Sequence, residues 1–180
     1  SEVTLINRIR DVLRGWRLGR ALFVADSGMN SLENRLELAR ACGRYVLACR
    51  AASVAEIKKD VLSRGGRYRT IRGNLRAKEV VVGEGEMRRR YIVCHNPAQA
   101  EREAKHRAEV IVQLELKLAE HPNRDATAKW AAKLRASGRY GRYLAVNKAG
   151  KLRINRAAIR EAARYDGRWV LLTNDDTLSV

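Results

Sequence analysis

One carboxylate in this chain, Asp26, stands where metal chemistry is most expected. It follows the apolar run 21–25 and precedes the turn formers Ser27 and Gly28. A short, continuous apolar run closed by a turn is typical of an interior strand. In open α/β sheets, ligands collect just beyond the carboxyl ends of the strands. The pattern therefore indicates a metal site at Asp26, with the alternative that the aspartate only bonds its own turn or caps the next helix.

The remaining acids, cysteines and histidines give weaker signals. Asp175 and Asp176 also follow an apolar run, but the composition of 174–177 is typical of a turn or a helix cap. Cys94 and His95 have no second pair at ligand spacing, so a zinc site is not predicted. The three histidines give no nucleophile–base pair. Solvated faces or pairs with Lys and Arg explain the glutamates on predicted helices, namely Glu33, Glu37, Glu101, Glu103, Glu109, Glu115 and Glu120.

Positive charge dominates the composition. The 180 residues contain 37 Lys and Arg against 20 Asp and Glu, a net charge of +17. Such a field attracts polyanions, and arginine suits bidentate phosphate contact. No run of 18 apolar residues and no basic amphipathic anchor occurs, which favours nucleic acid over a membrane. Although each run alone could be a solvated face, we predict DNA contacts from Arg64, Arg67, Arg69, Arg72, Arg76, Arg88, Arg89, Arg90, Arg139, Arg142, Lys148 and Lys151, with Tyr68, Tyr91, Tyr140 and Tyr143 as packing or sugar contacts.

The elements around Asp26 alternate between helix and strand. Helical spacing predicts a helix over 3–16, and apolar runs predict strands over 20–25 and 45–49. Between the strands, a helix over 31–42 has Ser31 as its N-cap and ends at Gly43. Its inward face is predicted to be Leu32, Leu36, Ala39 and Cys42. This order predicts an α/β fold with a mainly parallel sheet and flanking helices.

The composition changes after residue 50, where apolar runs become shorter and charged residues dominate. This change predicts a mixed α+β insertion over 51–167. Strands are predicted at 67–72, 77–82 and 88–94, with turns at the intervening glycines. A long helix begins at Pro97, and its stripe is Ala100, Ala104, Ala108, Ile111, Leu114 and Leu118. A helix at 126–137 with Trp130 inward, a hairpin over 143–154 and a short helix at 156–163 follow. The apolar run 169–173 then repeats the earlier strand pattern, so 168–180 is predicted to return to the sheet formed by 1–50.

These segments together resemble the DDE transposases of bacterial insertion sequences. The resemblance is carried by Val24-Ala25-Asp26-Ser27-Gly28-Met29, by Tyr45-Val46-Leu47, by the long basic insertion, and by the segment from Tyr165 to Asn174. The most similar subgroup has a ribonuclease-H-like core interrupted by a strand-rich insertion before its final glutamate. The resemblance covers nearly all of the chain and implies a partial ribonuclease-H-like fold.

In that family, two aspartates and one glutamate hold two divalent ions, Mg²⁺ or Mn²⁺, which cleave and transfer DNA strands. By position Asp26 matches the second aspartate, which makes it the catalytic and metal-binding residue here. The first aspartate is expected upstream of Ser1. The glutamate is expected beyond Val180 in a Tyr-x-x-Arg-x-x-x-Glu pattern that this sequence lacks. The resemblance therefore implies a fragment that is inactive alone and binds metal weakly or not at all.

The same resemblance implies the partners and location. Double-stranded DNA, both transposon ends and target, would be the partner, and the intact protein would act as a homodimer. Widely spaced Cys42, Cys49 and Cys94 are typical of reduced core residues, which agrees with a bacterial cytoplasmic, nucleoid-associated protein. Two alternatives stay open. One is a non-catalytic nucleic-acid-binding module, and the other is a metal-dependent nuclease that makes no strand transfer.

Overall fold

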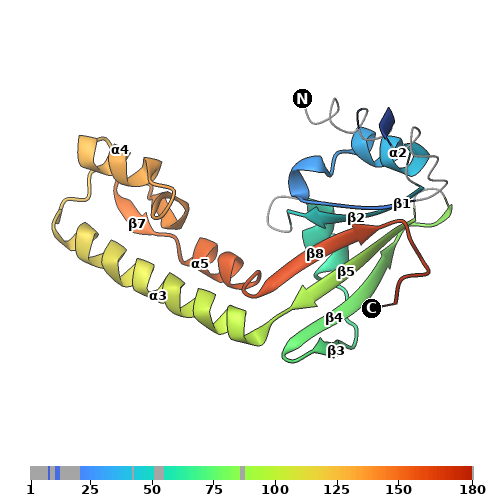
Figure 1. Ribbon diagram of the computed structural model, residues 1–180. Helices are drawn as coiled ribbons and strands as arrows, with labels where there is room; N and C mark the ends of the chain where they lie inside the picture. The colour runs from blue at the N-terminus through green and yellow to red at the C-terminus, as the bar shows by residue number, and fades with distance from the viewer. Residues whose placement is uncertain are drawn as a thin grey trace. The chain divides into compact units, whose positions relative to one another are not determined.

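The computed structural model divides the chain into two compact units (Figure 1). One comprises residues 1–97 and 168–180, and the other comprises residues 98–167. The helix predicted over 3–16 and the predicted core residue Cys42 lie largely or wholly outside the part of the chain that the structure describes. That part consists of residues 8, 11–12, 21–41, 43–50, 55–85 and 88–179.

A six-stranded sheet organises the first unit, in the order β1-β2-β8-β5-β4-β3. Among the described strands, β1 and β2 are parallel, and the four other pairings are antiparallel. The chain is thus a mixed α/β protein, and its sheet is not mainly parallel as predicted. The strands are β1 (Ala21–Ala25), β2 (Gly43–Cys49), β3 (Arg69–Arg72), β4 (Leu75–Val82), β5 (Arg89–His95) and β8 (Arg168–Thr173).

The difference has a simple cause in the lengths of the connections. Parallel neighbours need a long crossover, which helix α2 (Leu32–Ala41) supplies between β1 and β2. The turn at Gly73 and the short segment after Gly83 are too short for a crossover, so β3, β4 and β5 run antiparallel. Gly73 has a φ of 56°, a backbone conformation that residues with a side chain rarely adopt.

Helix α2 begins as predicted but turns a different face inward. The hydroxyl of Ser31 accepts a hydrogen bond from the backbone N–H of Asn34 at 3.1 Å, which confirms the predicted cap. Leu32, Leu36 and Ala39 are exposed, whereas Asn34 and Leu38 are buried. The predicted apolar face is therefore wrong. Asn34 tolerates burial partly because its side-chain amide donates to the Met29 carbonyl at 3.1 Å.

Strand β8 returns to the first sheet, as the repeated apolar pattern predicted. It lies between β2 and β5, and its Leu172 is opposite Leu47 on one side and Tyr91 on the other. Val93 and Val170 lie in the same core, which the short π-helix η2 (Ile57–Val61) covers through Ile57 and Val61. Strands β3, β4 and β5 share this sheet and belong to the first unit. The insertion over 51–167 stays a prediction.

The second unit has its own core. Four residues of α3 (Pro97–Ala119), from Val110 to Leu118, are buried against Ala131, Tyr143 and Leu152. His121 stacks on Trp130 with ring centroids 3.9 Å apart. In the described residues, no helix is both long and apolar enough to cross a bilayer. The other elements are α4 (Lys129–Ala136), η4 (Gly141–Tyr143), β6 (Leu144–Val146), β7 (Leu152–Ile154) and α5 (Arg156–Ala163).

Replacing Leu114 tests this second core. Leu114→Ala should lower the free energy of unfolding by about 2 to 5 kcal/mol, because the side chain is fully buried. The control Leu116→Ala lies two residues away on α3, where the side chain is 62% exposed, and should change stability by less than about 0.5 kcal/mol. Urea unfolding followed by circular dichroism measures both. Equal losses would contradict the buried face assigned to α3.

Candidate functional site

Asp26 lies exposed at the carboxyl end of β1. Its backbone caps the short 3-10 helix η1 (Ser27–Met29), and its Oδ1 accepts a hydrogen bond from the N–H of Gly28 at 2.9 Å. This bond is the capping contact that the sequence left open as an alternative. Within the described part of the chain, the second carboxylate oxygen, Oδ2, makes no hydrogen bond. The carboxylate thus caps a turn through one oxygen, and the residue as a whole is exposed.

A cleft of about 590 Å³ lies beside Asp26 and is lined by the next residues of the chain, Ser27 and Gly28. The carboxyl end of β2 contributes Cys49 and Arg50, and α2 contributes Arg35. Because β1 and β2 are parallel, their carboxyl ends meet at the same edge of the sheet. This edge is where α/β proteins commonly bind ligands. Arg35 and Arg50 were not singled out from the sequence, since only the parallel register brings them beside Asp26.

Polar contacts hold the walls of this cleft together. Asn30 donates to the carbonyl of Ala48 at 3.0 Å and to the sulfur of Cys49 at 3.1 Å. Arg35 donates to Asn30 Oδ1 at 3.2 Å, and Arg50 donates to the hydroxyl of Ser27 at 3.2 Å. Burial is the main cause that raises the pKa of Cys49 to about 11, so its thiol is protonated at neutral pH. The cleft therefore offers cationic and neutral donors beside Asp26, and no thiolate.

Glu56 is the carboxylate that lines the cleft itself, and both of its oxygens accept hydrogen bonds. Oε2 accepts from Arg89 at 2.5 Å, and Oε1 accepts from the hydroxyl of Tyr91 at 3.0 Å. Burial first, and then this bond, raise the pKa of Tyr91 to about 12, so the phenol stays a donor. Among the described residues, no three His, Cys, Asp or Glu side chains form a group that could hold a metal ion. Asp26 alone does not fit a two-metal centre.

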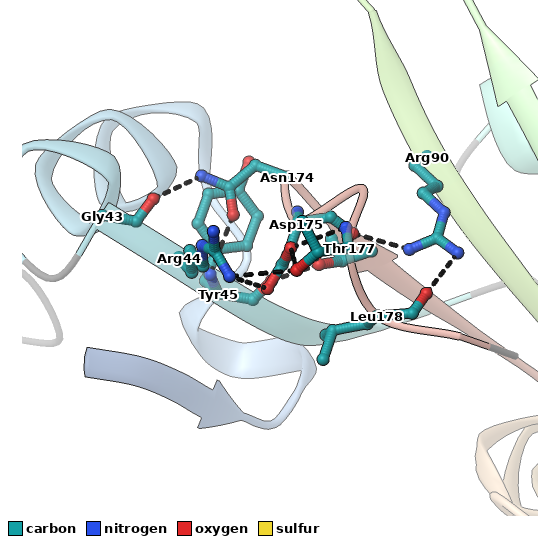
Figure 2. A network of polar contacts seen from close by, with 9 residues as sticks. Gly43, Arg44, Tyr45, Arg90, Asn174, Asp175, Thr177 and Leu178 are labelled. Atoms are coloured by element: carbon teal, nitrogen blue, oxygen red, sulfur yellow. Dashed lines mark hydrogen bonds and ion pairs between the residues drawn. The ribbon is translucent and has the colours of Figure 1, made fainter. Parts of the chain in front are cut away.

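Asp175 and Asp176 follow β8, whose last residue Thr173 is opposite Val46, and so lie toward the amino end of β2. Figure 2 shows the contacts of Asp175. Asp175 accepts two bonds from Thr177, at 2.9 and 2.7 Å, and pairs with Arg44 at 3.1 Å. The Thr177 bonds, more than Arg44, lower the pKa of Asp175. Arg44 is opposite Leu22 in β1. Leu22 precedes Asp26 by four residues, which is about 13 Å along a strand. These aspartates form a turn, as the sequence favoured, and cannot share a metal ion with Asp26.

The three consecutive arginines 88–90 each have an acidic partner within the fold. Arg88 donates to both oxygens of Asp176, and Arg89 donates to Glu56. Arg90 is 5% exposed and donates to Glu79. It also donates to the carbonyl of Asp175 at 2.6 Å and to the carbonyl of Leu178 at 2.7 Å (Figure 2). Their positive charges are largely compensated, so they are weaker candidates for DNA contact than the sequence indicated. DNA contact by these residues stays a prediction.

The hairpin of β3 and β4 is the exposed basic part of the first unit. All four residues of β3 are exposed, and β3 lies at the edge of the sheet. Arg64 donates to the carbonyl of Val81 at 2.7 Å. The remaining arginines of this region that are predicted to contact DNA make no ion pair within the described part of the chain. They are Arg67, Arg69, Arg72 and Arg76. These four side chains are available to phosphate.

In the second unit, positive charge gathers over residues 124–160. This stretch contains eleven Lys and Arg residues and one acid, Asp125. Arg139 lies over the ring of Tyr140 at 5.5 Å, and Arg142 lies over the ring of Tyr143 at 4.6 Å. Stacking of this kind pre-orients a guanidinium. Tyr143 and Tyr91 are buried and serve packing, whereas the turn of the β6–β7 hairpin presents Lys148 and Lys151.

Comparison with known proteins gives no match: no family model, curated protein or solved structure corresponds to this chain. The resemblance to DDE transposases therefore rests on the residues quoted in the sequence analysis. The sheet is mixed, with one parallel pair among its described strands, and the ribonuclease-H-like core stays a prediction.

Replacing Arg90 tests whether this arginine is structural. Arg90→Gln should lower the free energy of unfolding by about 2 to 3 kcal/mol, because hydrogen bonds to a buried charged group are lost. Arg90 lowers the pKa of Glu79 mainly by its hydrogen bond. The stabilisation from Glu79 is therefore present above its unfolded-state pKa and is lost as pH falls through its lower folded-state pKa. The difference between wild type and variant should shrink below about pH 4.

The matched control for this experiment is Arg88→Gln. Arg88 pairs with Asp176 on an exposed surface, where ion pairs contribute little, so its unfolding midpoint should stay close to that of wild type. Denaturant unfolding at several pH values measures both variants. An Arg90→Gln protein as stable as Arg88→Gln would show that the arginine does not fasten the C-terminal segment.

Proposed function

We propose that the chain is part of the catalytic domain of a DNA transposase and that Asp26 is one of the acids that hold its metal ions. The observation that carries the proposal is the position of Asp26. An exposed carboxylate ends β1, beside a parallel neighbour and a cleft with Arg35 and Arg50 on its walls. The return of β8 to the same sheet, after a basic insertion, agrees with the order of segments in the resembling family.

The chemistry of phosphodiester cleavage explains the need for further acids. Two metal ions about 4 Å apart activate the attacking oxygen and stabilise the leaving oxygen, and hard cations such as Mg²⁺ prefer carboxylate ligands. In this chain Asp26 would supply one ligand, and the partners implied by the resemblance lie outside it. Arg35 and Arg50 would attract the scissile phosphate by charge. No reaction step is assigned to these residues alone.

The basic surfaces would hold the DNA. Arg67, Arg69, Arg72 and Arg76 on the β3–β4 hairpin, and the stretch 124–160, carry cations without enough acids to neutralise them. Phosphate contact by Lys and Arg releases counterions and supplies most sequence-independent affinity. The intact protein would act as a homodimer on chromosomal DNA in the bacterial cytoplasm.

A non-catalytic nucleic-acid-binding module is the second candidate. The hydrogen bond from Gly28 to Asp26 favours it, because a capping aspartate needs no further role. In that case the same basic surfaces would bind nucleic acid, and substitution of Asp26 would affect only the local turn. The two candidates therefore differ in what Asp26 does in the protein encoded by the complete gene.

DNA binding is tested by removing hairpin charges. The triple variant Arg67→Gln, Arg69→Gln, Arg72→Gln should bind a fluorescent duplex more weakly and reduce the slope of log affinity against log salt by about 2.7, at 0.9 per phosphate contact. The control Arg40→Gln, Arg44→Gln, Arg164→Gln removes the same charge from arginines that pair with nearby acids and are not predicted DNA contacts. Fluorescence anisotropy measures both. If the two triple variants have equal slopes of log affinity against log salt, or if binding does not depend on salt, the hairpin does not contact the DNA phosphates.

Catalysis is tested through Asp26. The 180-residue chain should not nick supercoiled plasmid with Mg²⁺ or Mn²⁺, because one carboxylate cannot hold the metal pair. Its background should equal that of Asp26→Ala. The full-length protein should cleave transposon ends, and Asp26→Asn should abolish cleavage while DNA binding is retained.

Two results would be decisive against this assignment. Metal-dependent nicking by the 180-residue chain above the background of Asp26→Ala would contradict the claim that its metal site is incomplete. Cleavage by the full-length Asp26→Asn protein at the wild-type rate would leave the binding module as the better description.

A further inference from the structure

A second cleft, of about 560 Å³, lies beside the edge strand β3. Ala77 and Glu79 of β4 line it, on the face of the strand away from the core residue Val80. Arg69 of β3 is directly opposite Ala77 and therefore projects from that same face. Arg67, two residues earlier, also lines the cleft, and both arginines are exposed. The hairpin side of the cleft is therefore basic.

The other side of the cleft is formed by the C-terminal segment, residues 175–179, of which 176–179 line it. Arg90 lines the cleft and donates to the carbonyls of Asp175 and Leu178, at 2.6 and 2.7 Å (Figure 2). Arg44 of β2 pairs with Asp175, and Arg88 pairs with Asp176. Three arginines thus fasten a segment that belongs to no strand, and this side of the cleft is held in place.

The acids that line the cleft are already neutralised. Glu79 pairs with Arg90 at 2.9 Å, and Asp176 pairs with Arg88 at 2.5 Å. These hydrogen bonds are the main cause that lowers the pKa of each carboxyl, so both are ionised at neutral pH. Arg67 and Arg69 make no ion pair within the described part of the chain. Their two positive charges therefore face the cleft without a compensating acid.

Two simpler explanations account for the cleft less well. A metal site at Glu79 and Asp176 is disfavoured because both carboxylates pair with arginines, and no third ligand joins them among the described residues. Protection of a sheet edge by charge explains Arg69, because charged side chains on edge strands hinder pairing with another chain. It does not explain Arg67, which precedes β3, or the segment fastened across from it.

We propose that this cleft holds the sugar–phosphate backbone of one nucleic-acid strand, with a phosphate bound by Arg67 and Arg69. The inference rests on the nucleic-acid partner proposed above and names the place where one of its strands lies. Guanidinium groups suit phosphate oxygens because each can donate two parallel hydrogen bonds. Ala77 and Leu178, which is 36% exposed, offer apolar surface to the sugar, and the cleft is within the usual size of ligand sites, about 300–1,000 Å³.

The proposal places the C-terminal segment in the nucleic-acid interface. Residues 175–179 contain two acids and no base, so charge counting would exclude them from such a surface. In the fold, Arg44 and Arg88 compensate the two acids, and the exposed Ser179 adds a hydroxyl that can donate to a phosphate. The segment therefore contributes shape and neutral donors opposite the two free arginines.

The first experiment locates phosphate on the chain by NMR. The ¹⁵N-labelled chain is titrated with inorganic phosphate and with chloride at equal ionic strength. Phosphate alone should shift the amide signals of Ala77 and Ser179, which lie on different sides of the cleft. Arg67→Gln, Arg69→Gln should abolish these shifts. Absence of the shifts in wild type overturns the proposal.

The matched control is Arg72→Gln, Arg76→Gln. It removes two charges from the same hairpin, at positions that do not line the cleft, and should keep the phosphate-specific shifts. Arg67→Lys, Arg69→Lys keeps the charge of the edge but loses the paired donors, and should weaken the shifts. Equal shifts in the two glutamine variants would show that the hairpin attracts phosphate only by its overall charge, which overturns the proposal.

The second experiment tests the C-terminal segment with a fluorescent duplex. Ser179→Glu adds a carboxylate to that side of the cleft and should weaken binding about two- to fivefold, the effect of one close exposed charge. Ser179→Ala adds no charge and should bind close to wild type. Val112→Glu places the same charge at an exposed site on α3 and should have a smaller effect. An equal loss in Val112→Glu, or none in Ser179→Glu, overturns the proposal.

The two experiments distinguish the possible failures. Phosphate-specific shifts in the cleft of a chain that binds no duplex would keep the phosphate site and reject nucleic acid as its source. Duplex binding that needs the hairpin arginines but is unaffected by Ser179→Glu would keep the DNA partner and reject the cleft. Circular dichroism of each variant confirms that the sheet is intact before the comparison.

Discussion

The insertion of β8 between β2 and β5 is the pairing on which the first unit depends. Leu172 contacts the core from the middle of the sheet, opposite Leu47 and Tyr91. Without β8, the parallel pair β1–β2 and the meander β3–β5 would each expose an unpaired edge, which is costly and prone to association. The strand arrives after the whole second unit, so closing the sheet requires a contact between residues more than 70 positions apart along the chain. Such non-local pairing is slow to form.

The distribution of acids decides which of the many cations are available. With 20 acids for 37 Lys and Arg, only some of the arginines can have an acidic partner. Glu79 and the segment after β8 hold Arg90, Asp176 holds Arg88, and Asp166 holds Arg107 in the second unit. The charge without an ion-pair partner is left on the β3–β4 hairpin and gathers over 124–160. Net charge alone would have ranked all these arginines equally.

Asp26 illustrates how one residue can satisfy two descriptions at once. A turn of Ser27 and Gly28 needs an acceptor, and an aspartate supplies it through one oxygen. Asp26 is exposed beside a cleft whose walls include Arg35 and Arg50. Capping and metal binding are therefore compatible at this position.

Local features were predictable from the sequence because their causes lie within a few residues. The apolar runs became β1, β2 and β8, and Ser31 capped α2. Tertiary structure decided the rest. The antiparallel order of the sheet, the inward face of α2, the partners of Arg88 and Arg90, and the cleft between the hairpin and the C-terminal segment depend on strand register and on residues far apart in the chain. Periodicity and composition carry no information about those distances, because ion pairs and register are properties of the assembled core.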